Sequence, residues 1–390
     1  MSSPPASGDQ FDILQPTSLA GWTRAVGLRR QLLAPGGRGC GLELVPARRV
    51  TCDPPQFPQP DDAAFFFAGP PRNVVEYAVG PQRVEALSDA VVIGPKAVVA
   101  ASGRVFQETY WSEANLDDGV RFQRVRLKMQ MSSTGRTVPL EAVLWRKPSE
   151  IPRWSETAVL LAQPWAHNWH HWLLDSLPRL MVIADWPELA ALPVIVPGPL
   201  TEPQADALRA LGIDESRWRC LTGEAHEVET LILPQPGGFA PDVLQRLRGA
   251  LASPRTRGGS SRLYVSRHDA PSRRVANEAD LLAVLQPLGF RSLTLTGMSL
   301  AEQRKTFADA QVIVGPHGAG LTNSLFAPEG ATVVELHPRD TANGCFRLTT
   351  AAWGQQHVFL SGRVVNAQTR DFTVDPDLVR AVVESLRLGS

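Results

Sequence analysis

The sequence predicts an α/β protein with two doubly wound, Rossmann-like domains and a β-rich, irregular lobe before them. From about residue 155 onward, short apolar runs alternate with stretches that carry apolar residues at helical spacing. Such alternation is typical of βαβ units around a largely parallel sheet. In residues 253–261, Ser, Gly and Pro cluster between two ordered patterns, which indicates a linker. A length of 390 residues accommodates two or three domains.

The chain divides into four parts on this basis. Residues 1–150 are a lobe that contributes to the N-terminal domain, and residues 151–255 are a first Rossmann-like domain. Residues 262–375 are a second Rossmann-like domain after the linker, and residues 376–390 are a last helix expected to pack back on the N-terminal domain. In the lobe, short apolar runs between turn residues predict strands at 62–68, 89–93 and 97–101.

Each Rossmann-like domain is predicted element by element from its apolar pattern. Short apolar runs between turn signals predict the strands, at 157–162, 193–196, 228–233, 262–265, 290–295, 311–314, 332–336 and 357–360. Apolar residues at helical spacing predict the helices, at 168–184, 202–211, 241–251, 277–286, 300–308, 318–326 and 343–353. Asp375 followed by Pro376 is a typical helix start, which we prefer to a metal-binding Asp-x-Asp motif.

Composition excludes several classes of protein. The 39 basic and 39 acidic side chains cancel, so counterion release cannot drive strong non-specific binding to nucleic acid unless basic residues cluster. The four cysteines form no CxxC pair, which favours a reducing compartment over a zinc site or a disulfide framework. Residues 1–10 lack the features of a secretory signal, and no apolar run approaches the ~20 residues that span a bilayer. We expect a soluble protein.

A glycine-rich turn between a predicted strand and helix is the most informative segment. It contains Gly315, His317, Gly318, Ala319 and Gly320. Glycines at such a turn let the backbone approach a ligand, and the N–H groups of the helix then suit a phosphate. His317 could donate a hydrogen bond to the same oxygens. The alternative is a tight structural turn without a ligand.

Glu335 ends the next predicted strand, twenty residues after Gly315. In dinucleotide-binding folds an acidic residue at this place accepts hydrogen bonds from ribose hydroxyls. The alternative is an exposed carboxylate at a strand end. Together, a glycine turn for phosphate and a carboxylate for ribose predict a nucleotide ligand.

Three arginines follow the first strand of the second domain. Arg267 stands directly after the strand, and Arg273 and Arg274 lie in the loop before a helix for which Asn277 is the expected N-cap. Guanidinium groups at the carboxyl end of a parallel strand can bind a diphosphate with two hydrogen bonds each. A solvated basic loop is the alternative for the pair, so Arg267 is the preferred candidate.

The predicted helix 168–184 carries a candidate acid–base pair. His171 and Asp175 are four residues apart, which places them on one helical face within reach of each other. A carboxylate beside an imidazole raises its proton affinity and sets its tautomer, as a general base requires. The alternative is an aromatic core helix with one hydrogen-bonded histidine. Neighbouring His170 is a weaker candidate.

These segments resemble glycosyltransferase family 61, a group once described as a domain of unknown function. The segments are NWHHWLLDSLPRL, SRHDAPSRRVANEADLL and SLAEQRKTFADAQVIVGPHGAGLTNSLFAPEGATVVELHP. The resemblance covers about residues 155–360, and the N-terminal 150 residues carry no matching motif. It implies an inverting transferase of the GT-B type, in which two Rossmann-like domains face a cleft.

The resemblance also implies the reactants and the setting. The donor would be a nucleotide sugar, with a UDP-sugar favoured, and the acceptor a hydroxyl of a glycan or glycoconjugate. Metal and nucleic acid are not expected. Bacterial members are often linked to capsular or exopolysaccharide assembly, whereas eukaryotic members glycosylate proteins or xylan in the secretory pathway. Because we find neither a signal nor an anchor in the sequence, we expect the bacterial kind, a cytoplasmic enzyme that is either free or peripheral at the inner face of the membrane.

Site residues follow from the motifs and the resemblance together. The resemblance puts His171 and Asp175 on the acceptor side. His170 stands where bacterial members more often have an aromatic residue, so it is a second candidate for the base. The donor-side candidates are Arg267, Arg273, Arg274, Gly315, His317, Gly318, Ala319, Gly320, Asn323 and Glu335.

Two other functions fit parts of the pattern. A dinucleotide-dependent oxidoreductase would also use a glycine turn and an acidic residue, although here the turn lies deep in the second domain. The second alternative function is that of a catalytically inactive scaffold that binds nucleotide or carbohydrate. Binding of NADH would favour the first, and donor binding without turnover the second.

Overall fold

The computed structural model describes residues 12–17, 40–69, 74–93, 97–101, 104–106, 151–222, 225–251, 260–340 and 342–386. Most of the predicted linker and the stretch 107–150 of the lobe lie outside these residues. The chain separates into two units, which are described one at a time. Unit 1 comprises Met1–Arg48, Ala78–Gln204 and Gly212–Val243, and unit 2 comprises Arg49–Tyr77, Ala205–Leu211 and Leu244–Ser390. No helix in the described part of the chain is long and apolar enough to span a membrane.

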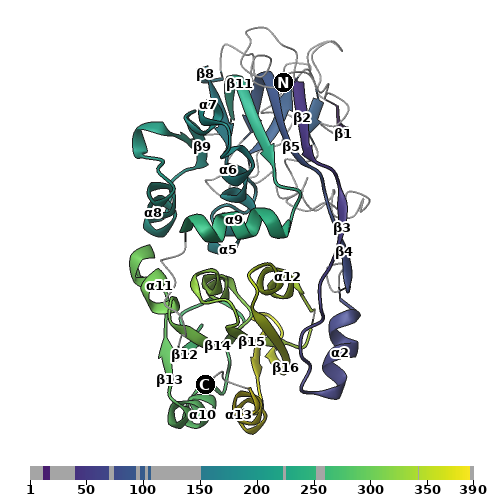
Figure 1. The fold of residues 1–390 in the computed structure, drawn as a ribbon, viewed down its shortest axis with the longest axis vertical. Helices are drawn as coiled ribbons and strands as arrows, with labels where there is room; N and C mark the ends of the chain where they lie inside the picture. Colours follow the sequence, from purple (N-terminus) through teal and green to yellow (C-terminus); the bar gives the residue numbers. More distant parts are fainter. Residues whose placement is uncertain are drawn as a thin grey trace, which may run out of the picture. The chain divides into compact units, whose positions relative to one another are not determined.

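Unit 1 is built on a sheet that is parallel in one half and mainly antiparallel in the other. Its order is β1-β7-β6-β5-β11-β8-β9-β10, and β2 also pairs with β5 (Figure 1). The strands, in chain order, are β1 Asp12–Thr17, β2 Cys40–Val45, β5 Gln82–Ile93, β6 Val98–Ala101, β7 Arg104–Phe106, β8 Arg153–Leu160, β9 Val194–Pro197, β10 Trp218–Leu221 and β11 Ala225–Gln235.

The two halves of this sheet meet at β11. Strands β8, β9, β10 and β11 run parallel, whereas β5 pairs antiparallel with β11. The described strands of the lobe therefore extend the sheet of unit 1. Along the parallel half the order of the chain reverses between β8 and β11. At such a reversal the connections leave in opposite directions, which is where doubly wound sheets bind ligands.

The helix predicted at 168–184 is present but interrupted. It consists of α5 Trp169–His171, a π-helical turn at Trp172–Ser176, and α6 Pro178–Ile183. The amide of Leu177 donates to the carbonyl of Trp172 at 3.0 Å, five residues back. Pro178 has no N–H for the carbonyl four residues before it, and its ring crowds that carbonyl. The proline therefore accounts for the local change of helical pitch.

Two other helices of this half of the chain, α8 Glu202–Ala210 and α9 Pro241–Leu251, agree with the predicted ranges. The short helix α7 Pro187–Ala190 and a 3₁₀ turn at Glu215–Arg217 were not predicted. Gly212 follows α8 with a positive φ of 76°, a conformation that glycine adopts without steric cost. The boundary between the two units falls within α9.

Unit 2 contains a sheet of order β13-β12-β14-β15-β16-β17, parallel except for the antiparallel last strand. Its strands are β12 Ser261–Val265, β13 Phe290–Leu293, β14 Ala310–Pro316, β15 Thr332–Pro338, β16 Gln356–Asn366 and β17 Asp371–Thr373. Its helices are α10 Glu278–Leu285, a 3₁₀ turn at Gln286–Leu288, α11 Leu300–Phe307, the 3₁₀ helix η8 Ala319–Phe326, α12 Cys345–Ala352 and α13 Pro376–Ser385. The order reverses between β12 and β14. The predicted α/β class with parallel sheets is confirmed.

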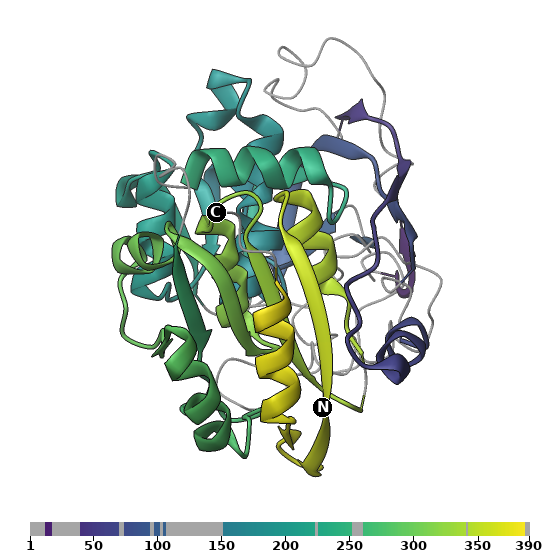
Figure 2. The same cartoon turned by 60° about the horizontal axis from the view of Figure 1, so that its bottom comes forward.

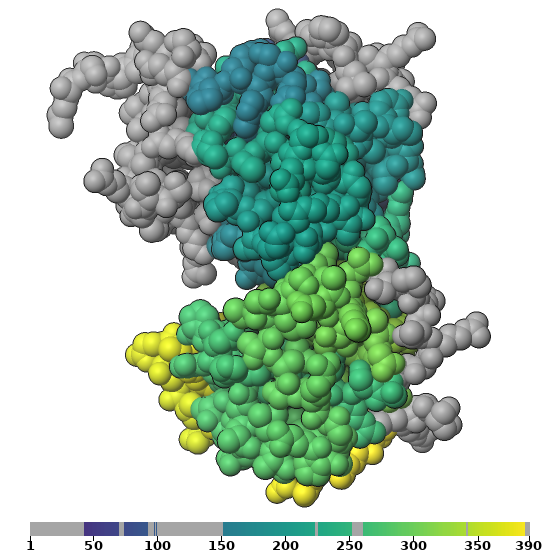
Figure 3. Space-filling view, turned by 90° about the vertical axis from the view of Figure 1, so that its left-hand side faces the viewer, coloured from purple at the N-terminus to yellow at the C-terminus, as the bar shows by residue number. Residues whose placement is uncertain are grey.

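The last helix completes unit 2. Val379, Val382 and Val383 of α13 lie in the same buried cluster as residues of α10 and the sheet. The yellow helix α13 lies against the sheet of unit 2 in Figure 2. We expected this helix to pack back on the N-terminal domain, whereas its described contacts are with unit 2. In the space-filling view, the yellow atoms of the C-terminal part of unit 2, which include β16, β17 and α13, lie beside green atoms of the same unit (Figure 3). The predicted start is confirmed, because the Asp375 carboxylate accepts the amides of Asp377 and Leu378.

Residues 49–77 of the lobe also belong to unit 2. Strands β3 Arg48–Thr51 and β4 Glu76–Val79 pair with each other and flank α2 Pro60–Phe67. The prediction of a strand at 62–68 was wrong. A short apolar run does not distinguish strand from helix, and burial here repeats every four residues, at Asp62 and Phe66.

Candidate functional site

The strongest candidate site lies where the strand order of unit 2 reverses. Arg267 follows β12 and Gly318 follows β14, and these neighbouring strands bring the two residues together. A Cβ atom on Gly318 would lie 2.0 Å from Nη1 of Arg267 and 2.6 Å from its Cζ. The guanidinium therefore lies directly on the glycine. Gly318 has extended backbone angles, so it is the close approach that requires a glycine here.

Arg267 keeps hydrogen-bonding capacity in this position. Its Nη2 donates to the carbonyl of Ser272 at 3.1 Å, whereas its buried Nε has no partner in the described part of the chain. Burial, together with repulsion from neighbouring Arg273, lowers the pKa of Arg267 to about 10, and Asp269 opposes the change. The group remains cationic at neutral pH. An anion would supply the missing acceptor.

Arg273 is a second cation of the same kind. It is half-buried, and burial followed by repulsion from Arg370 lowers its pKa. No acceptor for its guanidinium lies among the described residues, and its φ of 59° is a left-handed conformation that costs a non-glycine residue energy. Strained, uncompensated cations of this type are typical of ligand sites.

The turn after β14 adds backbone donors. The 3₁₀ helix Ala319–Phe326 begins directly after Gly318, and the first N–H groups of a helix have no partner within it. Ala319 and Gly320 are partly exposed. Gly320 packs 3.1 Å from Val265 and Leu295, and Gly315 packs 3.0 Å from the carbonyl of Val265, both measured to an added Cβ. Tight packing thus places the helix start at the strand ends.

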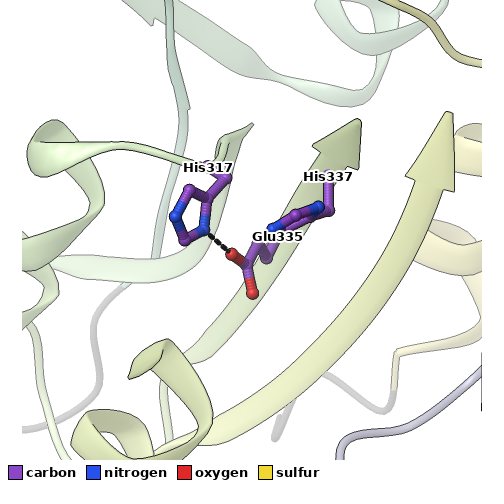
Figure 4. Close-up of side chains that lie close together, drawn as sticks. All are labelled: His317, Glu335 and His337. Carbon is purple, nitrogen blue, oxygen red and sulfur yellow. Dashed lines mark hydrogen bonds and ion pairs between the residues drawn. The ribbon is translucent and has the colours of Figure 1, made fainter. Parts of the chain in front are cut away.

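His317 is tied to a buried carboxylate. Its Nδ1 bonds to one oxygen of Glu335, and the other oxygen accepts from Nε2 of His357 at 2.9 Å. In Figure 4 the second ring nitrogen of His317 lies on the side of the ring away from Glu335. Glu335 is 0% exposed. In this arrangement it contacts histidines and has no surface for a ribose hydroxyl, which differs from the role expected from the sequence.

The pKa shifts of this group follow from its surroundings. Burial alone would raise the pKa of Glu335, but the attraction and hydrogen bonds of His317 and His357 outweigh burial and hold it well below the usual range. Burial lowers the pKa of His317; Glu335 opposes this, and Arg273 and Arg267 add to it. The consistent state at neutral pH is an ionised Glu335 that accepts an N–H from a neutral His317.

His337 completes a group of possible metal ligands. One ligand atom each from His317, Glu335 and His337 lie within 4.8 Å of one another (Figure 4). However, both oxygens of Glu335 already accept histidine N–H groups, and two guanidinium groups lie close enough to lower the pKa of His317. The chemistry of this set favours a hydrogen-bonded network over cation binding. The absence of a metal cofactor stays a prediction.

Three other predicted residues have structural partners. The Arg274 guanidinium pairs with Asp371 at 2.6 Å, which attaches its loop to β17. Asn323 is fully buried and donates to Gln303 of α11 at 2.8 Å. Asn277 stands at the N-cap of α10, but its amide bonds to the backbone of Val374 instead of capping the helix.

The predicted acid–base pair forms in unit 1. Nδ1 of His171 lies 2.6 Å from Oδ2 of Asp175, and 30% of the His171 side chain is exposed against 10% for Asp175. The helix that carries them follows β8, at the reversal of strand order in unit 1. The backbone amide of His170 is capped by Asn168, and its ring contacts that of His171 edge-on.

Sequence reasoning missed three buried residues near these groups. Arg179 donates to the carbonyl of Leu160 at the end of β8, and burial lowers its pKa to about 10 while nearby Asp175 opposes the change. His337 could have been found, because it stands two residues after Glu335 and therefore on the same face of β15. His357 reaches Glu335 only through the register of β15 and β16.

Known proteins resemble parts of this chain. The family model for Glycosyltransferase 61 matches residues 169–334, which include the acid–base pair, Arg267 and the glycine turn. Protein O-linked-mannose beta-1,4-N-acetylglucosaminyltransferase 2 is 40% identical in Homo sapiens over 70 residues, 17% of this chain and 12% of that protein. The Mus musculus protein is 36% identical over 99 residues, 21% and 17% of the two chains.

A second kind of relative gives the same class. The EGF domain-specific O-linked N-acetylglucosamine transferase of Bos taurus is 27% identical over 104 residues, 25% of this chain and 19% of that protein. The matched stretches thus span less than a fifth of each of these relatives. The family match and these relatives together support a glycosyltransferase of family 61.

Proposed function

We propose that the chain is an inverting glycosyltransferase of the two-domain GT-B type, which moves a sugar from a nucleotide-sugar donor to a hydroxyl of a glycan-type acceptor. One observation carries the proposal: Arg267 lies on the glycine turn at the strand-order reversal of unit 2, and its buried Nε–H has no acceptor among the residues that the structure describes. The similarity to glycosyltransferases supports the same class. Polysaccharide biosynthesis in the cytoplasm is the proposed setting, following the family resemblance.

In this proposal unit 2 binds the donor diphosphate. Arg267 and Arg273 supply positive charge and have no side-chain partner among the described residues. The amides of Ala319 and Gly320 stand at the start of the 3₁₀ helix, where N–H groups have no partner within the helix. When the bond between the sugar and the phosphate breaks, negative charge grows on the departing phosphate. Donors that are already oriented stabilise that charge without reorganising. Glu335 is buried, so it acts on the donor only through His317.

The acceptor hydroxyl is activated by the pair in unit 1. Asp175 accepts the Nδ1 proton of His171, which leaves Nε2 of the imidazole as the base. His171 takes the hydroxyl proton while the acceptor oxygen bonds to the anomeric carbon. The bond from that carbon to the phosphate breaks on the opposite face, which inverts the configuration. The guanidinium groups and helix amides replace a metal ion in this scheme.

N-acetylglucosamine is the first sugar to test. The names of both kinds of relative specify its transfer. A UDP-linked donor is the form that we favoured from the resemblance. The acceptors in those names are protein-linked, but the matched segments cover too little of each relative to transfer that choice here.

A nucleotide panel tests the proposal. UDP, GDP, CMP, dTDP and NADH are added separately to the protein, without metal and then with magnesium or manganese, and the melting temperature is measured. A ligand at 100 times its Kd stabilises the fold by about 2.7 kcal/mol, which gives a clear shift. One nucleoside diphosphate should stand out without metal. A response to NADH alone, or to no nucleotide, would contradict the proposal.

Two variants localise the binding. Arg267→Ala should remove most of the shift, because the diphosphate loses a guanidinium. Arg291→Ala is the matched control, since Arg291 is an exposed arginine on β13 of the same unit. Equal shifts in both variants would place the nucleotide elsewhere.

A further inference from the structure

The two nitrogens of His317 have different surroundings. Nδ1 bonds to Glu335, whereas Nε2 has no hydrogen-bond partner in the described part of the chain. The side chain is 9% exposed, and Figure 4 shows this nitrogen on the side of the ring away from Glu335. The guanidinium of Arg267 lies directly against the next residue, Gly318. One imidazole nitrogen is therefore engaged, and the other adjoins the candidate anion site.

Glu335 cannot reach a ligand, but it controls the histidine that can. Both of its oxygens accept imidazole N–H groups, from His317 of the glycine turn and His357 of β16, and its side chain is fully buried. These two bonds fix the orientation of the carboxylate and of the His317 ring. A negative charge in contact with Nδ1 also stabilises an imidazolium whenever other charges permit it.

The charges that face His317 come from several elements. Arg267 after β12 and Arg273 in the following loop disfavour a proton on it, whereas Glu335 of β15 favours one. The ring of His337 of β15 also contacts His317, but burial lowers the pKa of His337 to about 3, so it is neutral. His357 acts through Glu335, and α12 contributes only the uncharged ring of Phe346. With burial added, the opposing effects prevail and keep His317 neutral in the free protein.

A bound diphosphate reverses this balance. It would neutralise the two guanidinium groups and add negative charge beside Nε2, so that the attraction of Glu335 is no longer opposed. A protonated ring can then donate from both nitrogens, to the phosphate and to Glu335. We propose that Glu335 is the positioning residue of His317 and that a nucleotide sugar binds to unit 2 together with one proton, taken from solvent by His317. The inference rests on the proposed function.

Calorimetry in buffers of different ionisation enthalpy measures the proton directly. The probe is UDP-N-acetylglucosamine, followed by UDP-glucose and GDP-mannose, because the phosphates of a nucleotide sugar do not titrate near neutral pH. Up to one proton should be taken up per ligand, and the apparent Kd should rise by up to about tenfold per pH unit above neutrality. Binding without proton uptake would overturn this inference alone, and binding of none of the three probes would overturn the proposed function with it.

Variants assign the proton to its site. Glu335→Gln keeps a hydrogen-bond acceptor but removes the charge, and His317→Asn keeps an amide near Glu335 without a titrating group. Both should abolish proton uptake and flatten the dependence of Kd on pH. His226→Asn, which alters a buried histidine of unit 1, is the control and should behave as wild type. Unchanged uptake in folded His317→Asn would refute the assignment; if Glu335→Gln does not fold, His317→Asn and the wild-type protein still decide.

Discussion

Arg267 occupies the space that a side chain at position 318 would need. Its Nη1 lies 2.0 Å from where a Cβ of Gly318 would be, although the two residues are separated by fifty positions in the sequence. The glycine of this turn therefore has a partner within the protein. Its role in admitting an arginine adds to the close ligand approach that glycine turns usually provide.

Gly318→Ala should weaken the binding of the nucleotide donor without unfolding the protein. The added methyl group must displace the end of a flexible arginine, which costs the fold little but removes Arg267 from its position. We expect at least a tenfold loss of nucleotide affinity by calorimetry, with a nearly unchanged melting temperature. Gly249→Ala is the control: it lies in α9 with open space around it and should stabilise the helix by up to about 1 kcal/mol. Full nucleotide affinity in Gly318→Ala would show that the position of Arg267 against Gly318 does not matter for donor binding.

Asp175→Ala should separate catalysis from donor binding. Without the carboxylate, His171 loses its bonded partner and its tautomer is no longer set, so sugar transfer should fall by about 10²–10⁴-fold. The donor affinity of Asp175→Ala should stay within a factor of two of the wild type, whereas Arg267→Ala should lower the donor affinity itself. Initial rates with the donor and acceptor varied in turn measure both effects. Equal loss of donor binding in the two variants would refute this division.

His337 should make the stability of the fold sensitive to pH. Burial first, and then His317, lowers its pKa to about 3, and its Nδ1 donates to the carbonyl of Pro338 at 2.9 Å. The unfolded chain therefore binds a proton that the folded protein does not. Stability is present above the unfolded pKa of about 6.5 and falls by up to about 1.4 kcal/mol per pH unit as the pH drops from there towards 3.

His337→Asn tests this, because an amide can still donate to Pro338 but does not titrate. The slope of unfolding free energy against pH between 6.5 and 4 should become shallower, whatever the offset caused by the smaller side chain. Denaturant unfolding at several pH values measures it. His268→Asn, at an exposed position, should leave the slope unchanged. An unaltered slope in His337→Asn would show that this residue is not the titrating group.

Arg347→Met should loosen the N-terminal segment of unit 2. Arg347 of α12 is 1% exposed, and its guanidinium donates to the carbonyls of Cys52 at 2.6 Å, Asp53 at 3.4 Å and Val74. Each buried carbonyl left without a donor costs about 1–3 kcal/mol. We expect a lower melting temperature and faster proteolysis within 49–77. Arg363→Met, which changes an exposed arginine on β16, is the control. Identical proteolysis of the two variants would show that the hydrogen bonds of Arg347 do not hold residues 49–77 in place.

Much of the fold and part of the site follow from local pattern. The alternation of apolar runs located most strands of both parallel sheets to within a few residues, although it missed β10 and ended β16 too early. The helix Pro241–Leu251 was predicted to its ends. The contact of His171 with Asp175 was predicted because four-residue spacing on a helix is a local geometry. Arg267 and the glycine turn were each predicted from the sequence as candidates for binding a diphosphate, but their direct contact is a finding of the structure.

Other features depend on which strands are neighbours and on what is buried, and neither is encoded in local periodicity. The sequence by itself determined the α/β class, the helix carrying the acid–base pair, and the glycine turn. Only the tertiary structure decided that Glu335 is a buried partner of two histidines, that Arg274 pairs with Asp371, and that residues 49–77 and α13 complete unit 2. The physical reason is that periodicity reports the face on which a side chain lies, whereas charge partners and burial depend on strand order and register across the sheet.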